Sequence, residues 1–147
     1  MDDRITAAAF RRAFQEADDL APLVLPDGEV VSSSDADIAP LRDALRSAAW
    51  IRTVEPGASG VGQTLSVWPS DGVQVNFFLG WGAPIEFDFD LRELVDDEAV
   101  DSLIHLLRLV SSVVSKDVII RPEGQNNARP VLHIDATTGG TSLSPRS

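Results

Sequence analysis

Three carboxylates spaced two residues apart are the first side chains in this sequence that could do chemistry. Glu86, Asp88 and Asp90 alternate with apolar residues between positions 85 and 91, and side chains at i, i+2 and i+4 of a strand share one face, roughly 6 to 7 Å apart. Hard cations bind such oxygen ligands, and paired carboxylates carry out acid–base chemistry. A calcium site also needs ligands that converge through a turn, and a glycosidase needs its pair across a cleft. The pattern therefore favours a solvated sheet face and predicts no metal or cofactor site.

Aromatic residues are expected on the same face as the carboxylates. Trp68 and Phe78 lie out of phase with the apolar residues of their predicted strands, and Trp81 lies at the turn that follows. Aromatic side chains anchor protein interfaces, whereas charges steer association. In the alternative, helices or a second copy cover this face and the aromatics belong to the core. The predicted interaction surface consists of Trp68, Phe78, Trp81, Glu86, Asp88 and Asp90.

The two histidines offer a second candidate site. His133 and Asp135 lie on one face of a predicted strand, and an aspartate that orients a histidine is part of the Ser-His-Asp triad. No serine, however, stands in a nucleophile elbow such as GxSxG. His105 follows Asp101 by four residues on the polar side of a predicted helix, where an ordinary exposed pair is expected. The sequence thus predicts no catalytic residue. The alternative is a small-ligand pocket or an enzyme site near His133, Asp135 and the strand from Glu86 to Asp90.

A glycine-rich segment, GASGVGQT over residues 57–64, is one residue short of the phosphate-binding motif GxxxxGK[ST]. Gln63 stands where the motif has the lysine that reaches the β- and γ-phosphates. Residues 65–68 then alternate like a strand, whereas the motif must lead into a helix whose N-terminus faces the phosphates. The segment is therefore predicted to be a connection between strands and not a nucleotide site.

The charge of the chain bears on its partners. Its 147 residues include 23 Asp and Glu against 12 Lys and Arg, which gives a formal net charge of −11. Nucleic-acid binding depends on cations that displace phosphate counterions, and anionic membranes attract basic segments, so neither partner is expected. A basic protein partner and self-association remain. Cysteine is absent, which excludes disulfides and thiolate chemistry.

The location of the chain is inferred from its N-terminus and its apolar runs. The first four residues, Met-Asp-Asp-Arg, lack the basic and apolar pattern of a signal peptide. Its apolar runs are short and interrupted, well below the ~20 residues that span a bilayer. A cytoplasmic location is therefore expected.

Hydrophobic periodicity predicts helices over residues 5–17 and 38–48, and a long helix that opens at Asp96 or Asp97. Alternating strands are predicted over residues 65–68, 73–79 and 85–91 as an antiparallel meander, with a short strand at 50–54 and two more at 118–120 and 131–134. Pro26, Asp27 and Gly28 predict a turn between two short extended pieces.

The fold class predicted from these elements is α+β, with a mainly antiparallel sheet of about five or six strands packed against one long helix, and with N-terminal helices. A single domain is expected over residues 1–135, followed by a flexible polar tail over 136–147.

In its order of elements, the chain from Ile38 onward resembles the helix–three-strand–helix–two-strand arrangement of type III secretion chaperones and YbjN-like proteins. Small bacterial immunity proteins are similar in size, acidity and mixed architecture. These resemblances imply a small bacterial-type domain that binds another protein. Together with the acidic, aromatic-bearing sheet face, they lead us to expect a non-enzymatic protein-interaction module of an immunity-like or chaperone-like kind.

Overall fold

One antiparallel sheet organises the fold. The computed structural model describes residues 5–17, 26–54, 63–80, 83–121 and 130–143. The strands form a single sheet in the order β2-β3-β4-β5-β1-β6-β7-β8, and every neighbouring pair is antiparallel. The predicted α+β class with a mainly antiparallel sheet is thus confirmed. The strands are β1 (Asp27–Val30), β2 (Arg52–Val54), β3 (Gln63–Ser70), β4 (Val73–Leu79), β5 (Ile85–Phe89), β6 (Val118–Arg121), β7 (Leu132–Ile134) and β8 (Thr141–Leu143).

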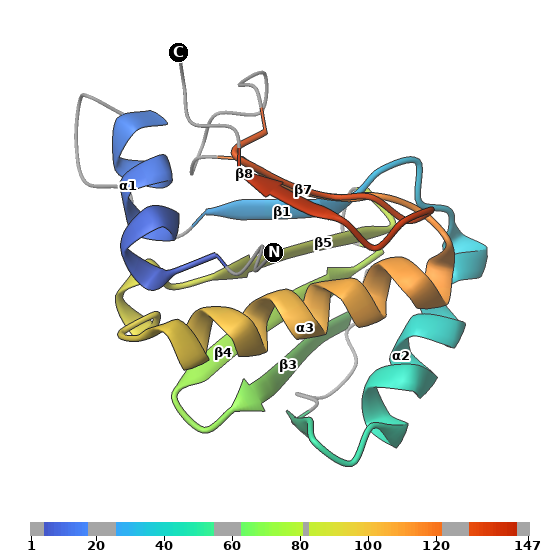
Figure 1. The fold of residues 1–147 in the computed structure, drawn as a ribbon. Coiled ribbons are helices and arrows are strands. Elements are labelled where there is room, and N and C mark those ends of the chain that lie inside the picture. The colour runs from blue at the N-terminus through green and yellow to red at the C-terminus, as the bar shows by residue number, and fades with distance from the viewer. Residues whose placement is uncertain (1–4, 18–25, 55–62, 81–82, 122–129, 144–147) are drawn as a thin grey trace.

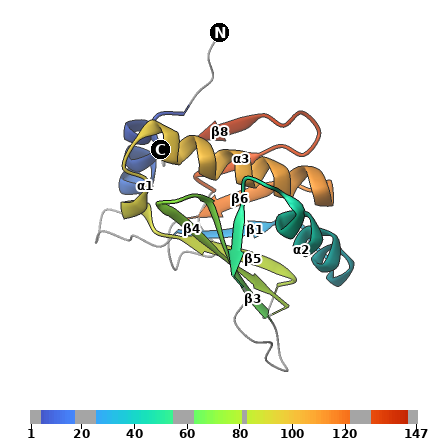
Figure 2. The ribbon, with the colours of Figure 1, turned by 90° about the horizontal axis from the view of Figure 1, so that it is seen from below.

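Three helices lie on one side of this sheet (Figures 1 and 2). They are α1 (Ala7–Ala17), α2 (Ile38–Ser47) and α3 (Asp97–Val114). Helix α3 runs across the sheet, with α1 near its N-terminal end and α2 near its C-terminal end (Figure 1). Two short 3-10 turns, η1 (Asp35–Asp37) and η2 (Leu91–Glu93), precede α2 and α3.

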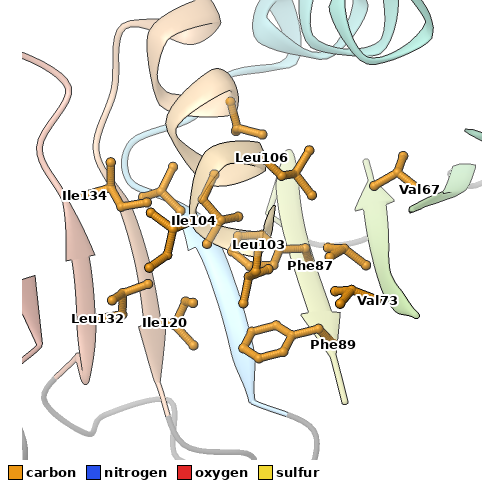
Figure 3. Packing of buried hydrophobic residues seen from close by; sticks show 14 of the residues in the cluster. Val67, Val73, Phe87, Phe89, Leu103, Ile104, Leu106, Ile120, Leu132 and Ile134 are labelled. Carbon is orange, nitrogen blue, oxygen red and sulfur yellow. The ribbon is translucent and has the colours of Figure 1, made fainter. Parts of the chain in front are cut away.

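The long helix is defined by its cap and by its apolar face. Asp96 Oδ1 accepts a hydrogen bond of 2.8 Å from the backbone N–H of Ala99, and an acidic first turn complements the helix dipole. The helix ends at Val114 and is followed by the C-cap residue Ser115, whose φ of 56° is left-handed. Leu103, Ile104 and Leu106 point at the apolar side chains of the sheet (Figure 3). The buried residues of α3 are Ala99, Val100, Leu103, Ile104, Leu106, Leu107, Val110, Ser111 and Val114.

Helix α1 packs on the same core near the N-terminal end of α3 (Figure 1). Its Phe10 and Phe14 lie 6.1 and 6.5 Å from the ring of Phe89 on β5, measured between ring centroids. The backbone N–H of Ala7 also donates a 2.8 Å hydrogen bond to Asp97 Oδ1 in the first turn of α3. Both contacts tie the start of the chain to the sheet and to the long helix.

The turn predicted at residues 26–28 is wrong. Asp27 and Gly28 belong to β1, which lies between β5 and β6, with Gly28 facing Phe87 on one side and Ile120 on the other. A Cβ atom added at Gly28 would lie 2.0 Å from Cζ of Phe87. The glycine therefore makes room for the Phe87 ring, which lies over the β1 backbone. An Asp-Gly pair is a strong local turn signal, but the packing of the central strand overrides it.

The last strand lies inside the range for which the sequence predicts a flexible tail. Strand β8 pairs with β7 in an antiparallel register, and Arg108 Nε of α3 donates a 3.1 Å hydrogen bond to Thr141 Oγ1. The chain thus continues in the sheet as far as Leu143. Residues 144–147 lie outside the described residues, so their flexibility stays a prediction.

Candidate functional site

One face of the sheet carries none of the described helices, and it is here named the open face. On β4 and β5 the alternate residues are buried toward the helices, which confirms the predicted alternation. The intervening side chains therefore point away from the helices. Because facing residues of neighbouring strands share a face, the register extends this assignment across the sheet. The open face includes Asp27, Glu29, Arg52, Val54, Ser66, Trp68, Asn76, Phe78, Glu86, Asp88, Ile119, Arg121 and His133.

Four carboxylates meet at the centre of the open face. Glu86 and Asp88, both predicted from the sequence, lie on β5 and directly face Glu29 and Asp27 of β1. These four residues are named the acid block. Facing residues of an antiparallel pair have Cβ atoms about 4.5 to 5.5 Å apart, and like charges at such positions repel each other. The acid block therefore concentrates negative charge at the centre of this face.

The sequence does not predict Asp27 and Glu29 as members of the site, because Asp27 falls in the predicted turn. A usable signal is nevertheless present. Asp27 and Glu29 alternate with the buried Gly28 and Val30, which is the same period-2 pattern that predicts β5. The turn propensity of Asp and Gly outweighs this pattern when only the local sequence is considered.

The carboxylates of the acid block differ in their partners. The Arg121 guanidinium forms an ion pair with Glu29, and Asn76 Nδ2 donates a 3.1 Å hydrogen bond to Asp88 Oδ1. The Glu86 side chain makes no hydrogen bond or ion pair with any residue that the structure describes. It lies between Glu29 on β1 and Phe78 on β4, and directly faces both. Within the described chain, Glu86 is thus the member best placed to bind a cation from outside.

Asp90, the third predicted carboxylate, lies at the border of the open face just beyond β5. Its side chain accepts a 2.9 Å hydrogen bond from the backbone N–H of Arg92 and forms a 2.7 Å ion pair with the Arg92 guanidinium. The hydrogen bond from this guanidinium lowers the pKa of Asp90, because it stabilises the charged carboxylate. Asp90 therefore caps η2 and is already engaged by a cation of its own chain.

Two of the three predicted aromatic residues lie half-buried on the open face. The guanidinium carbon of Arg52 lies 4.3 Å from the centroid of the Trp68 ring, which is a cation–π contact. Phe78 directly faces Glu86. Neither Trp68 nor Phe78 belongs to the buried core. Trp81 lies outside the described residues.

His133 also points to the open face, but its partner is not the predicted Asp135. His133 Nε2 lies 2.7 Å from Asp117 Oδ2, and Asp117 Oδ1 accepts a 2.9 Å hydrogen bond from the backbone N–H of Ala136. These two hydrogen bonds, chiefly that from the backbone N–H of Ala136, lower the pKa of Asp117. Asp135 instead accepts the backbone N–H of Thr137 at 2.7 Å, in the turn that leads to β8. The pair therefore holds the β7–β8 hairpin onto the start of β6.

We expect Asp117→Asn to lower the free energy of unfolding by about 0.5 kcal/mol at neutral pH, because two hydrogen bonds lose a charged acceptor and solvent screens a side chain that is 39% exposed. Since the pKa of Asp117 is lower in the folded state than its ordinary value of 3.8, this stabilisation is present above that value and is lost as the pH falls through the folded pKa. Urea unfolding of both proteins at neutral pH and at about pH 2.5 measures the difference. A deficit of equal size at both pH values would contradict this role.

The second histidine has an aromatic partner that the sequence does not predict. His105 of α3 stacks on Trp50, which lies between α2 and β2, with ring centroids 4.2 Å apart and an interplanar angle of 3°. The indole is 39% exposed. This contact fastens the segment before β2 to the outer side of α3, on the opposite side of the sheet from the acid block.

Most of the glycine-rich segment, residues 57–62, lies outside the described residues. Gln63 and Thr64 are the first residues of β3, so the segment leads into a strand, as the sequence predicts. Arg42 Nη1 of α2 donates a 2.7 Å hydrogen bond to Gln63 Oε1. The side chain that stands in place of the phosphate-binding lysine thus contacts α2.

The described residues contain no group of three or more His, Asp or Glu side chains arranged to hold a metal ion. No helix in the described ranges is long and apolar enough to cross a membrane. Comparisons with protein-family models, with curated proteins and with solved structures found no match to this chain.

Proposed function

We propose that this chain is a non-enzymatic protein-interaction module whose open face binds a basic protein partner. The observation that carries the proposal is the acid block, which lies next to Phe78 at the centre of a sheet face that carries none of the described helices. Negative and positive surfaces attract each other, accelerate encounter and select the partner, while half-buried aromatic side chains supply apolar contact area. Neutralisation of a toxin or binding of a secreted substrate, as in immunity proteins and chaperones, is the concrete form of this role.

The energetics of β1 and β5 support a binding role over a purely structural one. Glu86 directly faces Glu29, and like charges at facing positions of a sheet cost stability, roughly 0.2 to 1 kcal/mol per pair. The ion pair of Arg121 with Glu29 offsets part of this repulsion in the free protein, and a cation supplied by a partner relieves more of it in the complex. Glu86→Gln is therefore expected to stabilise the free protein by up to about 1 kcal/mol and, at the same time, to weaken partner binding.

No specific observation favours the alternative of a ligand pocket or enzyme site near His133, Asp135 and the Glu86–Asp90 strand. His133 is bonded to Asp117, and Asp135 is engaged in the turn before β8. Each of these two side chains is therefore hydrogen-bonded to a group other than its predicted partner.

Affinity purification from the native host tests the proposed function. The wild-type protein is compared with Glu86→Gln/Asp88→Asn, and with Asp43→Asn/Glu98→Gln, which removes the same number of charges from exposed positions on α2 and α3. We expect a basic protein to copurify with the wild type and with the helix-side control. We expect it to be lost from the open-face variant and at high salt, because ionic contacts are screened. An identical set of proteins on all three baits would contradict the proposal.

A further inference from the structure

Two arginines of the open face already make contacts with its carboxylates and aromatic rings. Arg121 pairs with Glu29, and Arg52 lies over Trp68 at 4.3 Å. A guanidinium is planar, so it can pair with a carboxylate through two hydrogen bonds and can stack on an aromatic ring. A lysine ammonium is a strongly hydrated point charge and does neither as well. Carboxylates and aromatic rings on this face are thus groups that bind arginine within the chain itself.

Phe78 and Glu86 form a further combination of the same two groups. They face each other directly on β4 and β5, so their Cβ atoms are about 4.5 to 5.5 Å apart. Phe78 is half-buried, and the Glu86 side chain has no hydrogen bond or ion pair with a described residue. A guanidinium that lies on the Phe78 ring, within the ~6 Å reach of a cation–π contact, is therefore also within reach of the Glu86 carboxylate.

We infer that Phe78 and Glu86 form a subsite for an arginine side chain of the partner protein. This inference rests on the proposed function and adds the chemistry of the contact. The Glu86 carboxylate binds the edge of the guanidinium and the Phe78 ring binds its face. Glu29 on β1 adds negative potential on the far side of Glu86, because it faces Glu86 in the register. A lysine at the same place keeps the charge attraction and loses the stacked, two-bond geometry.

An NMR titration of the isotope-labelled full chain tests the subsite with two capped pentapeptides. One carries two arginines separated by a serine, and the other carries lysines at the same positions. We expect both peptides to shift the amide signals of residues 77–79 and 85–87, and the arginine peptide to bind at least about threefold more tightly, as a cation–π contact of exposed groups allows. Phe78→Leu is expected to remove this preference, Glu86→Gln to weaken both peptides, and Asp43→Asn on α2 to leave both titrations unchanged.

The outcomes separate the subsite from the proposed function. Equal affinity of the two peptides would overturn the inferred arginine subsite, and so would a preference for the arginine peptide that survives Phe78→Leu. Either result can occur even if the open-face variant, Glu86→Gln/Asp88→Asn, still loses its copurifying partner. The inferred subsite is also overturned if the peptides shift only amide signals outside residues 77–79 and 85–87, or if they shift no signals. A dispersed amide spectrum of each variant verifies that it is folded, and Glu86→Gln provides a test that leaves the Phe78 packing intact.

Discussion

Gly28→Ala is expected to lower the free energy of unfolding by about 3 kcal/mol, the upper part of the usual range for overpacking a core. The added Cβ would lie 2.0 Å from Cζ of Phe87, which is far inside van der Waals contact. Phe87 is 1% exposed and belongs to the buried core, so its ring has little room to move. Either the ring or β1 must shift, and β1 is held between β5 and β6. Urea denaturation monitored by circular dichroism gives the difference.

Two further variants decide whether the clash with Phe87 is the cause. Phe87→Leu in the Gly28→Ala background removes the obstructing ring, so the double variant should be less destabilised than the sum of the two single variants. Gly72→Ala is the matched control, because no atom lies within 4 Å of its added Cβ, and a change of no more than about 0.5 kcal/mol is expected there. A Gly28→Ala protein as stable as the wild type would show that Phe87 does not cover β1.

Leu103→Ala is expected to cost about 3 to 4 kcal/mol, within the range measured for leucine truncation in closed cores. Leu103 is fully buried and points from α3 toward Phe87 and Phe89 of the sheet (Figure 3). Leu109→Ala on the same helix is the matched control, because Leu109 is only partly buried against the core. Its expected cost is less than half as large. Equal costs for the two variants in urea unfolding would contradict the orientation of α3.

The sequence predicts the meander and α3 because their hydrophobic periodicity and their local signals agree. In β4 and β5 every second residue is buried, and α3 has an aspartate cap and an acidic first turn. A helix or strand can be predicted from one sequence when its local propensity agrees with its tertiary packing in this way. The orientation of Phe78, Glu86 and Asp88 follows from the same alternation.

The sequence fails where a short strand depends on distant partners. Strand β1 has only four residues, and it begins with an Asp-Gly pair that locally favours a turn. Its place between β5 and β6 depends on residues about 60 and 90 positions away, and the local turn signal outweighs the short period-2 pattern of residues 27–30. Half of the acid block, Asp27 and Glu29, is missing from the predicted surface for this reason.

The partner of His133 shows the same limitation. Asp135 is close in sequence, but the backbone turns after β7 and uses that carboxylate to accept the N–H groups of Thr137 and Thr138. Asp117 precedes β6, and the pairing of β6 with β7 brings it to the imidazole. Strand register thus decides which of the two aspartates forms a hydrogen bond with His133, and a single sequence does not specify that register.

Site-specific photo-cross-linking in the native host tests the claim that the open face is the docking surface most directly. A photoreactive phenylalanine replaces Phe78, which keeps an aromatic ring on the open face, and a second protein carries it at Ser112, an exposed position on α3. We expect a covalent adduct with a basic protein from position 78, at low but not at high salt, and no such adduct from position 112. Adducts that form from position 112 alone would place the partner on the helices and contradict the account.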